Sequence, residues 1–204
     1  MTKIKICGLT NLTDVIAAVQ LKVDYLGFIF YSESPRFATP EFVAKANKVI
    51  PSNIKKVGVF VNAPKCVISI YEQQLNLDIV QLHGDKDCAM IKNLSSITWR
   101  ALHLTNEFEL QDAVNCSAEK IVVDSRTATE FGGTGQVCDW QIAKKLSEKR
   151  DILLAGGINE NNVVEAINTV QPFGIDVSSG VESEPGKKDH QKMFNLVKKI
   201  RSLG

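Results

Sequence analysis

The chain is poor in the residues that build zinc sites and disulfide frameworks. It has three histidines and five cysteines in 204 residues, and no two cysteines form a CxxC pair. The cysteines are odd in number and widely spaced, at Cys7, Cys66, Cys88, Cys116 and Cys138. Structural zinc sites need clustered ligands, and small disulfide-rich domains need an even set of cysteines. We therefore expect no metal site, no disulfide framework and a reducing, cytoplasmic location.

Excess charge of one sign and long apolar runs are also missing. Lys and Arg number 24 against 23 Asp and Glu, which gives a formal net charge of +1. A nearly neutral chain is not typical of proteins that bind nucleic acid or anionic membranes. No apolar run is long enough to span a bilayer, and no secretory leader precedes the first predicted strand. We expect neither nucleic acid nor membrane as a partner.

What the chain does contain is one pattern repeated eight times, in which a short apolar strand precedes a turn and an amphipathic helix. The predicted strands are 3–7, 25–30, 55–61, 79–82, 97–102, 120–124, 152–155 and 174–177. The predicted helices are 13–22, 40–49, 64–75, 85–94, 106–114, 140–148, 160–170 and 189–201. Alternating strands and helices indicate a parallel sheet, and eight such units indicate a closed barrel. We predict one α/β domain over residues 1–204, an eight-stranded parallel (β/α)₈ TIM barrel.

An open, doubly wound sheet is the alternative fold. It usually has fewer strands and carries GxGxxG directly after the first strand. Here the first strand is followed by CGLT instead, which favours the closed barrel.

Two chemically active residues end predicted strands. Cys7 ends the first strand, in KIKICGLT, and Asp124 ends the sixth, in KIVVD. Barrel active sites lie at the C-terminal ends of the strands, although a lone cysteine is more often a small apolar core residue. A glycine-rich loop rather than a helix follows Asp124, so an acid or base is favoured there over a helix cap.

Glycine and serine gather after the last two strands. Gly156 and Gly157 follow the seventh strand, and Ser178, Ser179 and Gly180 follow the eighth. Backbone amides and hydroxyls in such loops bind phosphate, and these two loops form the usual phosphate site of the fold. Tight turns are the alternative, but two such loops in the paired positions favour phosphate.

Other loops hold further candidates for ligand binding. Gly132 and Gly133 either extend the phosphate site or belong to a flexible lid. Arg36, fixed by the neighbouring Pro35, is suited to bind a carboxylate bidentately, although most arginines are simply solvated. His83 is as consistent with a packed side chain as with a donor to a ligand.

Lys5 and Asp176 are predicted to point into the barrel, on adjacent first and last strands. A lone charge there would cost several kcal/mol. We expect a buried Lys5–Asp176 ion pair below the active site, with snorkelling of one side chain to the barrel end as the alternative.

Taken together, the motifs resemble those of the phosphoribosylanthranilate isomerase family of tryptophan biosynthesis. The matching stretches are KICGLT (5–10), GFIFYSESPRF (27–37), VGVFVN (57–62), VQLHG (80–84), VVDS (122–125), FGGTGQVCDW (131–140), LAGGINENNV (154–163) and GIDVSSGVESEPGKKD (174–189). They span essentially the whole chain in the family's order, and their combination is far more specific than any single motif. Ser125 and Val137-Cys138 depart mildly from the family pattern, at positions without a chemical role.

The resemblance implies an Amadori rearrangement of N-(5-phosphoribosyl)anthranilate to 1-(2-carboxyphenylamino)-1-deoxyribulose 5-phosphate. It implies Cys7 as general base and Asp124 as general acid, with a raised pKa at Asp124 and a pKa of Cys7 lowered by Lys5. The implied substrate-binding residues are Arg36 for the carboxylate, with His83, Gly132, Gly133, Gly156, Gly157, Asp176, Ser178, Ser179 and Gly180. No metal or cofactor is implied, because the substrate nitrogen serves as the electron sink. A monofunctional monomer is the default, with a homodimer as the alternative.

Three other functions compete with this interpretation. A metal-dependent epimerase needs converging histidines and carboxylates, which three scattered histidines supply poorly. A histidine-pathway aminoaldose isomerase would use an aspartate where Cys7 stands. A phosphometabolite sensor would keep the phosphate loops but would not need both Cys7 and Asp124.

Overall fold

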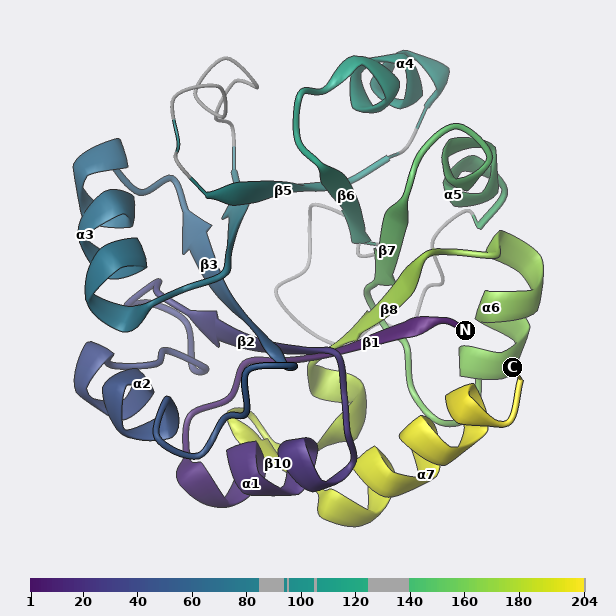
Figure 1. Cartoon of the computed structure of the whole chain (residues 1–204). Coiled ribbons are helices and arrows are strands. Elements are labelled where there is room, and N and C mark those ends of the chain that lie inside the picture. The colour runs from purple at the N-terminus through teal and green to yellow at the C-terminus, as the bar shows by residue number, and fades with distance from the viewer. Residues whose placement is uncertain (85–93, 95, 105, 125–139, 204) are drawn as a thin grey trace.

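The computed structural model describes residues 1–84, 94, 96–104, 106–124 and 140–203. Its parallel strands form a closed eight-stranded barrel in chain order, with β8 paired onto β1. Figure 1 shows the strands around a common centre and the helices outside them. The strands are β1 Lys3–Cys7, β2 Tyr25–Ile29, β3 Lys55–Val61, β4 Ile79–His83, β5 Ile97–Leu102, β6 Lys120–Asp124, β7 Ile152–Ala155 and β8 Gly174–Val177. The predicted (β/α)₈ architecture is confirmed.

Helices connect the strands and cover the outside of the barrel (Figure 1). They are α1 Leu12–Gln20, α2 Pro40–Ala46, α3 Lys65–Leu75, α4 Glu107–Asn115, α5 Trp140–Ser147, α6 Val163–Val170 and α7 His190–Arg201. Side-chain caps start several of them: Asn11 accepts the Asp14 N–H at α1, and Asp189 accepts the Lys192 N–H at α7. The helix predicted at 85–94 lies outside the described residues, apart from position 94.

Alternation along the strands divides the apolar core into two parts. Side chains such as Ile4 and Ile6 point outward and pack with the helices. The inward side chains form a second cluster inside the barrel: Cys7, Val57, Val59, Ile79, Trp99, Ala101, Val122, Leu153 and Ala155. Trp99 packs edge-on against Tyr25, with ring centroids 4.9 Å apart. The barrel interior is therefore filled by side chains at this level, as is typical of the fold.

Two local features differ from the sequence prediction. Helix α6 begins at Val163 rather than Glu160, because the Asn162 side chain accepts the Asn159 N–H at 2.9 Å and holds a separate turn before the helix. A short 3₁₀ helix, η2 (Ser179–Val181), and a small hairpin follow β8. The hairpin consists of β9 Glu182–Glu184 and β10 Lys187–Lys188. Its sequence, ESEPGKK, has no apolar alternation from which strands would be predicted.

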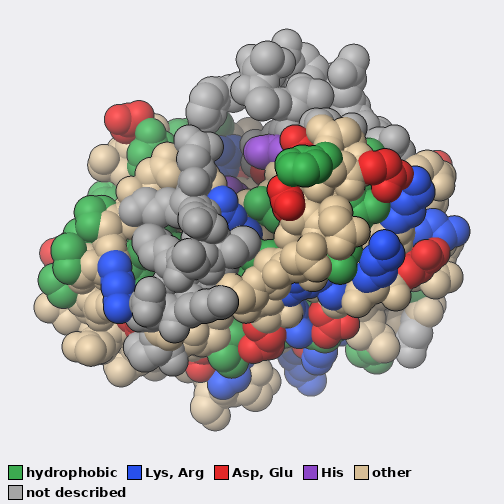
Figure 2. All heavy atoms as spheres, turned by 90° about the horizontal axis from the view of Figure 1, so that it is seen from above, with side chains coloured by type: hydrophobic (Ala, Val, Ile, Leu, Met, Phe, Trp, Pro, Cys, Tyr) green, Lys and Arg blue, Asp and Glu red, His purple; other side chains and the backbone are tan. Residues whose placement is uncertain are grey.

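Acidic and basic side chains lie interspersed on the face shown in Figure 2. Within the described part of the chain, no helix combines the length and hydrophobicity needed to cross a bilayer.

Cys7 and Cys66 are free thiols, but Cys116 is disulfide-bonded. The cysteine spacing gave no sign of this disulfide bond, because spacing along the chain does not report which thiols meet in the fold.

Candidate active site

A cavity of about 270 Å³ lies at the C-terminal ends of the strands. Parallel strands all end on the same side, so residues far apart in sequence converge there. The cavity lining includes these predicted site residues: Cys7, Arg36, His83, Asp124, Gly156, Gly157, Asp176, Ser178, Ser179 and Gly180. The other two predicted positions, Gly132 and Gly133, lie outside the described residues.

Lys5 is the centre of a buried polar cluster beneath this cavity. Its ammonium donates to Asp176 Oδ2 and Gln81 Oε1, both at 2.7 Å, and to Cys7 Sγ at 3.3 Å. Burial lowers the pKa of Lys5, but the Asp176 carboxylate and the Cys7 sulfur outweigh it, so the pKa is raised and Lys5 stays charged. The predicted buried Lys5–Asp176 ion pair is confirmed.

Cys7 combines burial with a cationic neighbour, and the two effects oppose each other. Burial raises the pKa of the Cys7 thiol, while the charge of Lys5 lowers it. Burial is the larger effect, so the pKa lies above its ordinary value of 9.0. The expectation of a net lowered pKa was therefore wrong, although the sign of the Lys5 contribution was right.

Gln81 forms hydrogen bonds with both Lys5 and His83 and so links them. Because an ammonium can only donate, Gln81 must turn its oxygen to Lys5 and its amide N–H to His83 Nε2, 2.7 Å away. His83 Nε2 is thus the acceptor in this contact. Gln81 was not predicted as a site residue. Strand alternation would have predicted its inward position, because it shares one face of β4 with Ile79 and His83.

Asp124 lies at the end of β6 with its side chain buried against the cavity. Its main-chain carbonyl accepts a hydrogen bond from His103 Nδ1 at 3.0 Å. That contact holds the strand end from which the carboxyl group projects. Nothing in the sequence had singled out His103, because the partner is a backbone atom of another strand.

The loops after β7 and β8 pack directly on one another. Gly156 and Gly157 have φ values of +76° and +66°, a conformation that costs glycine little. A Cβ on Gly180 would lie 1.9 Å from the carbonyl oxygen of Ile158, so only glycine fits there. The Ser178 hydroxyl is buried with no hydrogen-bond partner among the described residues, which leaves it for a ligand.

Asp176 also has hydrogen-bonding capacity for a ligand. Its Oδ2 accepts from Lys5, while the buried Oδ1 has no partner within the described part of the chain. Because Asp176 lines the cavity, Oδ1 is suited to accept from a ligand hydroxyl. One carboxylate thus serves the ion pair and the cavity together.

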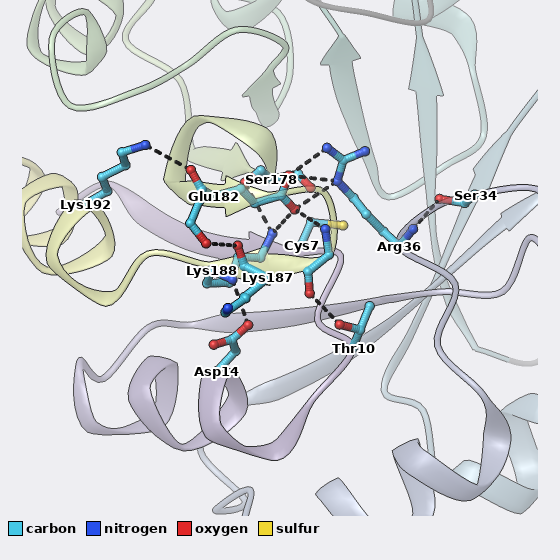
Figure 3. A network of polar contacts seen from close by, with 12 residues as sticks. Cys7, Thr10, Asp14, Ser34, Arg36, Ser178, Glu182, Lys187, Lys188 and Lys192 are labelled. Atoms are coloured by element: carbon cyan, nitrogen blue, oxygen red, sulfur yellow. Dashed lines mark hydrogen bonds and ion pairs between the residues drawn. The ribbon is translucent and has the colours of Figure 1, made fainter.

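Arg36 binds a carboxylate in this structure, but it is that of Glu182. Arg36 Nε donates to both Glu182 oxygens at 2.9 and 3.1 Å, and Nη2 donates to Oε2 at 2.6 Å (Figure 3). Lys188 donates to Glu182 Oε1 at 2.8 Å. Sequence reasoning missed Glu182 and Lys188, since they approach Arg36 only through the unpredicted hairpin.

Among the described residues, no group of three or more His, Cys, Asp or Glu side chains is placed to hold a metal ion. The chemical groups at the cavity are instead a thiol, carboxyl groups, an imidazole, a guanidinium and glycine-rich loops. This set suits proton transfer on an anionic ligand.

Replacing Lys5 with methionine is expected to destabilise the fold by roughly 3–5 kcal/mol, because it leaves Asp176 buried without its cation. For a chain of this size the melting temperature should fall by roughly 10 °C, measured by calorimetry. Lys55→Met is the matched control, because Lys55 is also a strand lysine paired with an aspartate, Asp78, but its side chain is 49% exposed. Equal melting temperatures for the two variants would contradict the proposed cost.

Comparison with known proteins decides the family. The sequence profile described as N-(5'-phosphoribosyl)anthranilate (PRA) isomerase matches residues 4–199. The chain belongs to the PRA isomerase family. The sequence motifs predicted this family, and the independent comparison agrees with them.

Individual PRA isomerases match over the whole chain. The N-(5'-phosphoribosyl)anthranilate isomerase of Thermoanaerobacter sp. (strain X514) is 41% identical over 204 residues, which is 100% of both chains. The crystal structure of phosphoribosyl anthranilate isomerase from Thermotoga maritima has a TM-score of 0.92 at 34% identity, covering 99% of this chain and 100% of that one. A structure in complex with reduced 1-(o-carboxyphenylamino)-1-deoxyribulose 5-phosphate has a TM-score of 0.89 at 33% identity, with 99% and 100% covered.

Proposed function

We propose that this chain converts N-(5'-phosphoribosyl)anthranilate to 1-(2-carboxyphenylamino)-1-deoxyribulose 5-phosphate in tryptophan biosynthesis. The observation that carries the proposal is one cavity lined by Cys7, Asp124, Arg36 and the loops after β7 and β8, in a chain of the PRA isomerase family. The substrate needs the same four functions: a base, an acid, a carboxylate receptor and a phosphate receptor.

The reaction is a proton relay between two strand ends. Asp124 gives its proton to the furanose ring oxygen, the C1–O bond breaks, and the nitrogen lone pair forms an iminium ion. Cys7, as thiolate, removes the C2 proton, and the electrons flow to the nitrogen to give an enolamine. Tautomerisation of the enolamine yields the ketone. The Lys5 ammonium, 3.3 Å from Sγ, stabilises the thiolate that this step requires.

Binding at both ends of the substrate places the reacting carbons between these groups. We assign the phosphate to the backbone amides of Gly156, Gly157 and Gly180 with the hydroxyls of Ser178 and Ser179. Geometric fixation of this kind removes much of the entropic part of a reaction barrier.

Further assignments follow from the same cavity. Arg36 receives the anthranilate carboxylate, Asp176 Oδ1 accepts from a ribose hydroxyl, and His83 contributes to the wall of the substrate pocket. The substrate nitrogen is the electron sink, so the proposed chemistry uses no cofactor. We further propose that the chain works as one domain, as a monomer in the cytoplasm. One solved relative concerns monomers of the dimeric Thermotoga maritima enzyme, so a homodimer is the alternative.

The test is direct turnover of the labile substrate, generated in situ and followed through the loss of its fluorescence. The purified chain should consume it, and EDTA should leave the rate unchanged because no metal takes part. Binding without turnover would contradict the enzyme and favour a phosphometabolite sensor. A rate abolished by EDTA would contradict the metal-free mechanism.

A further inference from the structure

We propose that Glu182 and Lys188 are positioning residues that aim Arg36 at the substrate carboxylate and keep its positive charge available for it. The inference rests on the proposed function and deepens it at the carboxylate end of the site. The sequence motifs predict no role for either residue. Figure 3 shows the side chains of Arg36, Glu182 and Lys188 converging from different segments.

The first observation is the direction of the guanidinium. Glu182 occupies the Nε–Nη2 edge of Arg36, with three contacts between 2.6 and 3.1 Å. A guanidinium offers two such edges for bidentate carboxylate binding. Since Glu182 takes one, the edge formed by Nη1 and the second Nη2 hydrogen is left for a second carboxylate. Arg36 lines the cavity, so that edge is the one available to a ligand.

The second observation is the charge balance. Arg36 and Glu182 alone would be neutral, and Glu182 would repel an incoming carboxylate. Lys188 is fully buried and donates to Glu182 Oε1 at 2.8 Å. Burial lowers the pKa of Lys188 and the Glu182 carboxylate opposes this, so the three groups together carry one positive charge while Lys188 is protonated. Burial raises the pKa of Glu182, but the hydrogen bonds and charges of Arg36 and Lys188 outweigh it, so Glu182 stays ionised.

The third observation is that the hairpin carrying both residues is fixed to the β1 end of the site. Glu182 and Lys188 are ladder partners in the β9–β10 hairpin. Lys188 N–H donates to Asp14 on α1 at 2.8 Å, and Lys188 Nζ donates to the Ser178 carbonyl at 3.2 Å. The Thr10 hydroxyl donates to the Gly186 carbonyl (Figure 3).

Gly8, which directly follows β1, lies against the Arg36 side chain. A Cβ at Gly8 would lie 2.8 Å from Arg36 Cδ and 2.9 Å from Ser178 Oγ, so the arginine stem rests directly on the turn that follows Cys7. The position of Arg36 is thus set relative to both the thiol and the phosphate loop. A carboxylate bound there places the rest of the substrate with it.

The experiment compares two stable ligands that differ in one group. The first is reduced 1-(o-carboxyphenylamino)-1-deoxyribulose 5-phosphate, and the second is the same molecule without its carboxyl group. Affinities are measured by titration calorimetry for wild type, Glu182→Gln and Lys188→Met. Each variant should bind the carboxylated ligand roughly tenfold or more weakly, because Glu182→Gln frees the Arg36 guanidinium to turn away from the ligand carboxylate and Lys188→Met removes the net positive charge. The carboxyl-free ligand should bind to each variant as it does to wild type.

Three further variants sharpen the test. Lys187→Met is the matched control, because Lys187 neighbours Lys188 in β10 but is exposed and, among the residues that the structure describes, its ammonium pairs with Glu184 alone. This variant should bind both ligands normally. The double variant Glu182→Gln/Lys188→Met should bind the carboxylated ligand better than Lys188→Met alone, since it restores the charge balance. In an Arg36→Met background, Glu182→Gln should have no further effect.

Kinetics separate positioning from a general structural fault. The carboxylate does not react, so losing its receptor should raise KM, and the looser fixation of the substrate should lower kcat by a smaller factor. Misfolded enzyme would instead lower apparent kcat at constant KM. The inference is overturned if Glu182→Gln weakens the binding of both ligands equally or of neither. If Lys188→Met does not fold, the result for Glu182→Gln decides alone. Wild type that binds neither ligand would overturn the proposed function instead.

Discussion

Cys7→Ser is expected to lower kcat by roughly 10²–10⁴-fold with little change in KM, which is the range that general base catalysis contributes. A serine hydroxyl keeps the volume and can still accept from Lys5. It cannot ionise near neutral pH, so it cannot take the C2 proton as the thiolate does. Because the substrate is held by its two ends, binding should survive the change.

The control for Cys7→Ser is Cys66→Ser, since Cys66 is a free but exposed thiol outside the cavity lining. That variant should turn over substrate at the wild-type rate. Activity of Cys7→Ser within tenfold of wild type would contradict the role of Cys7 as base. Ligand titration on the same protein sample verifies that the cavity is intact.

Asp124→Asn is expected to cause a loss of similar size, roughly 10²–10⁴-fold in kcat, because the amide cannot deliver a proton to the ring oxygen. Asp151→Asn is the matched control. Asp151 lies just before β7 and pairs with Lys120 at the opposite end of β6, with an N–O distance of 3.0 Å. Its replacement should leave turnover unchanged, whereas equal losses in both variants would contradict a specific role for Asp124.

The pH dependence of the remaining Asp124→Asn activity is a second readout. With the acid removed, the rate should follow the ionisation of Cys7. Burial raises the pKa of that thiol above 9.0, and Lys5 only partly opposes it. Well below this pKa the thiolate fraction rises about tenfold per pH unit, so residual kcat/KM, which reports ionisations of the free enzyme, should still be increasing at pH 9. A plateau reached well below pH 9 would assign the base to another group.

The fold was largely predictable because the spacing of apolar residues differs between strands and helices. The strand over Lys55–Val61 and the strand over Lys120–Asp124 were predicted with their observed bounds. The start of α6 was not, because the Asn162 side chain competes locally with the helix. The β9–β10 hairpin was missed for a different reason. It is held by charged side chains that contact other segments, not by a face of apolar residues.

The site was predictable wherever strand parity and strand ends decide geometry. The barrel topology alone predicts that Cys7 and Asp124 lie at the cavity. The energetic cost of an unpaired charge inside the barrel predicts the Lys5–Asp176 pair. Glu182 and Lys188 could not be predicted in this way, because their roles depend on which ions they meet in space. The direction of the Cys7 pKa shift also required burial, which the sequence does not provide.

The ion pair between Lys5 and Asp176 joins β1 to β8, residues 171 apart in the chain. Closing so long a loop carries an entropic cost that is repaid only when the intervening strands are ordered. Cys7 ends β1 and the Ser178 loop follows β8, so the proposed base and the proposed phosphate site meet only where these two strands pair. We therefore expect no turnover during refolding until β8 has paired with β1. Recovered turnover then reports that the ring of strands has closed.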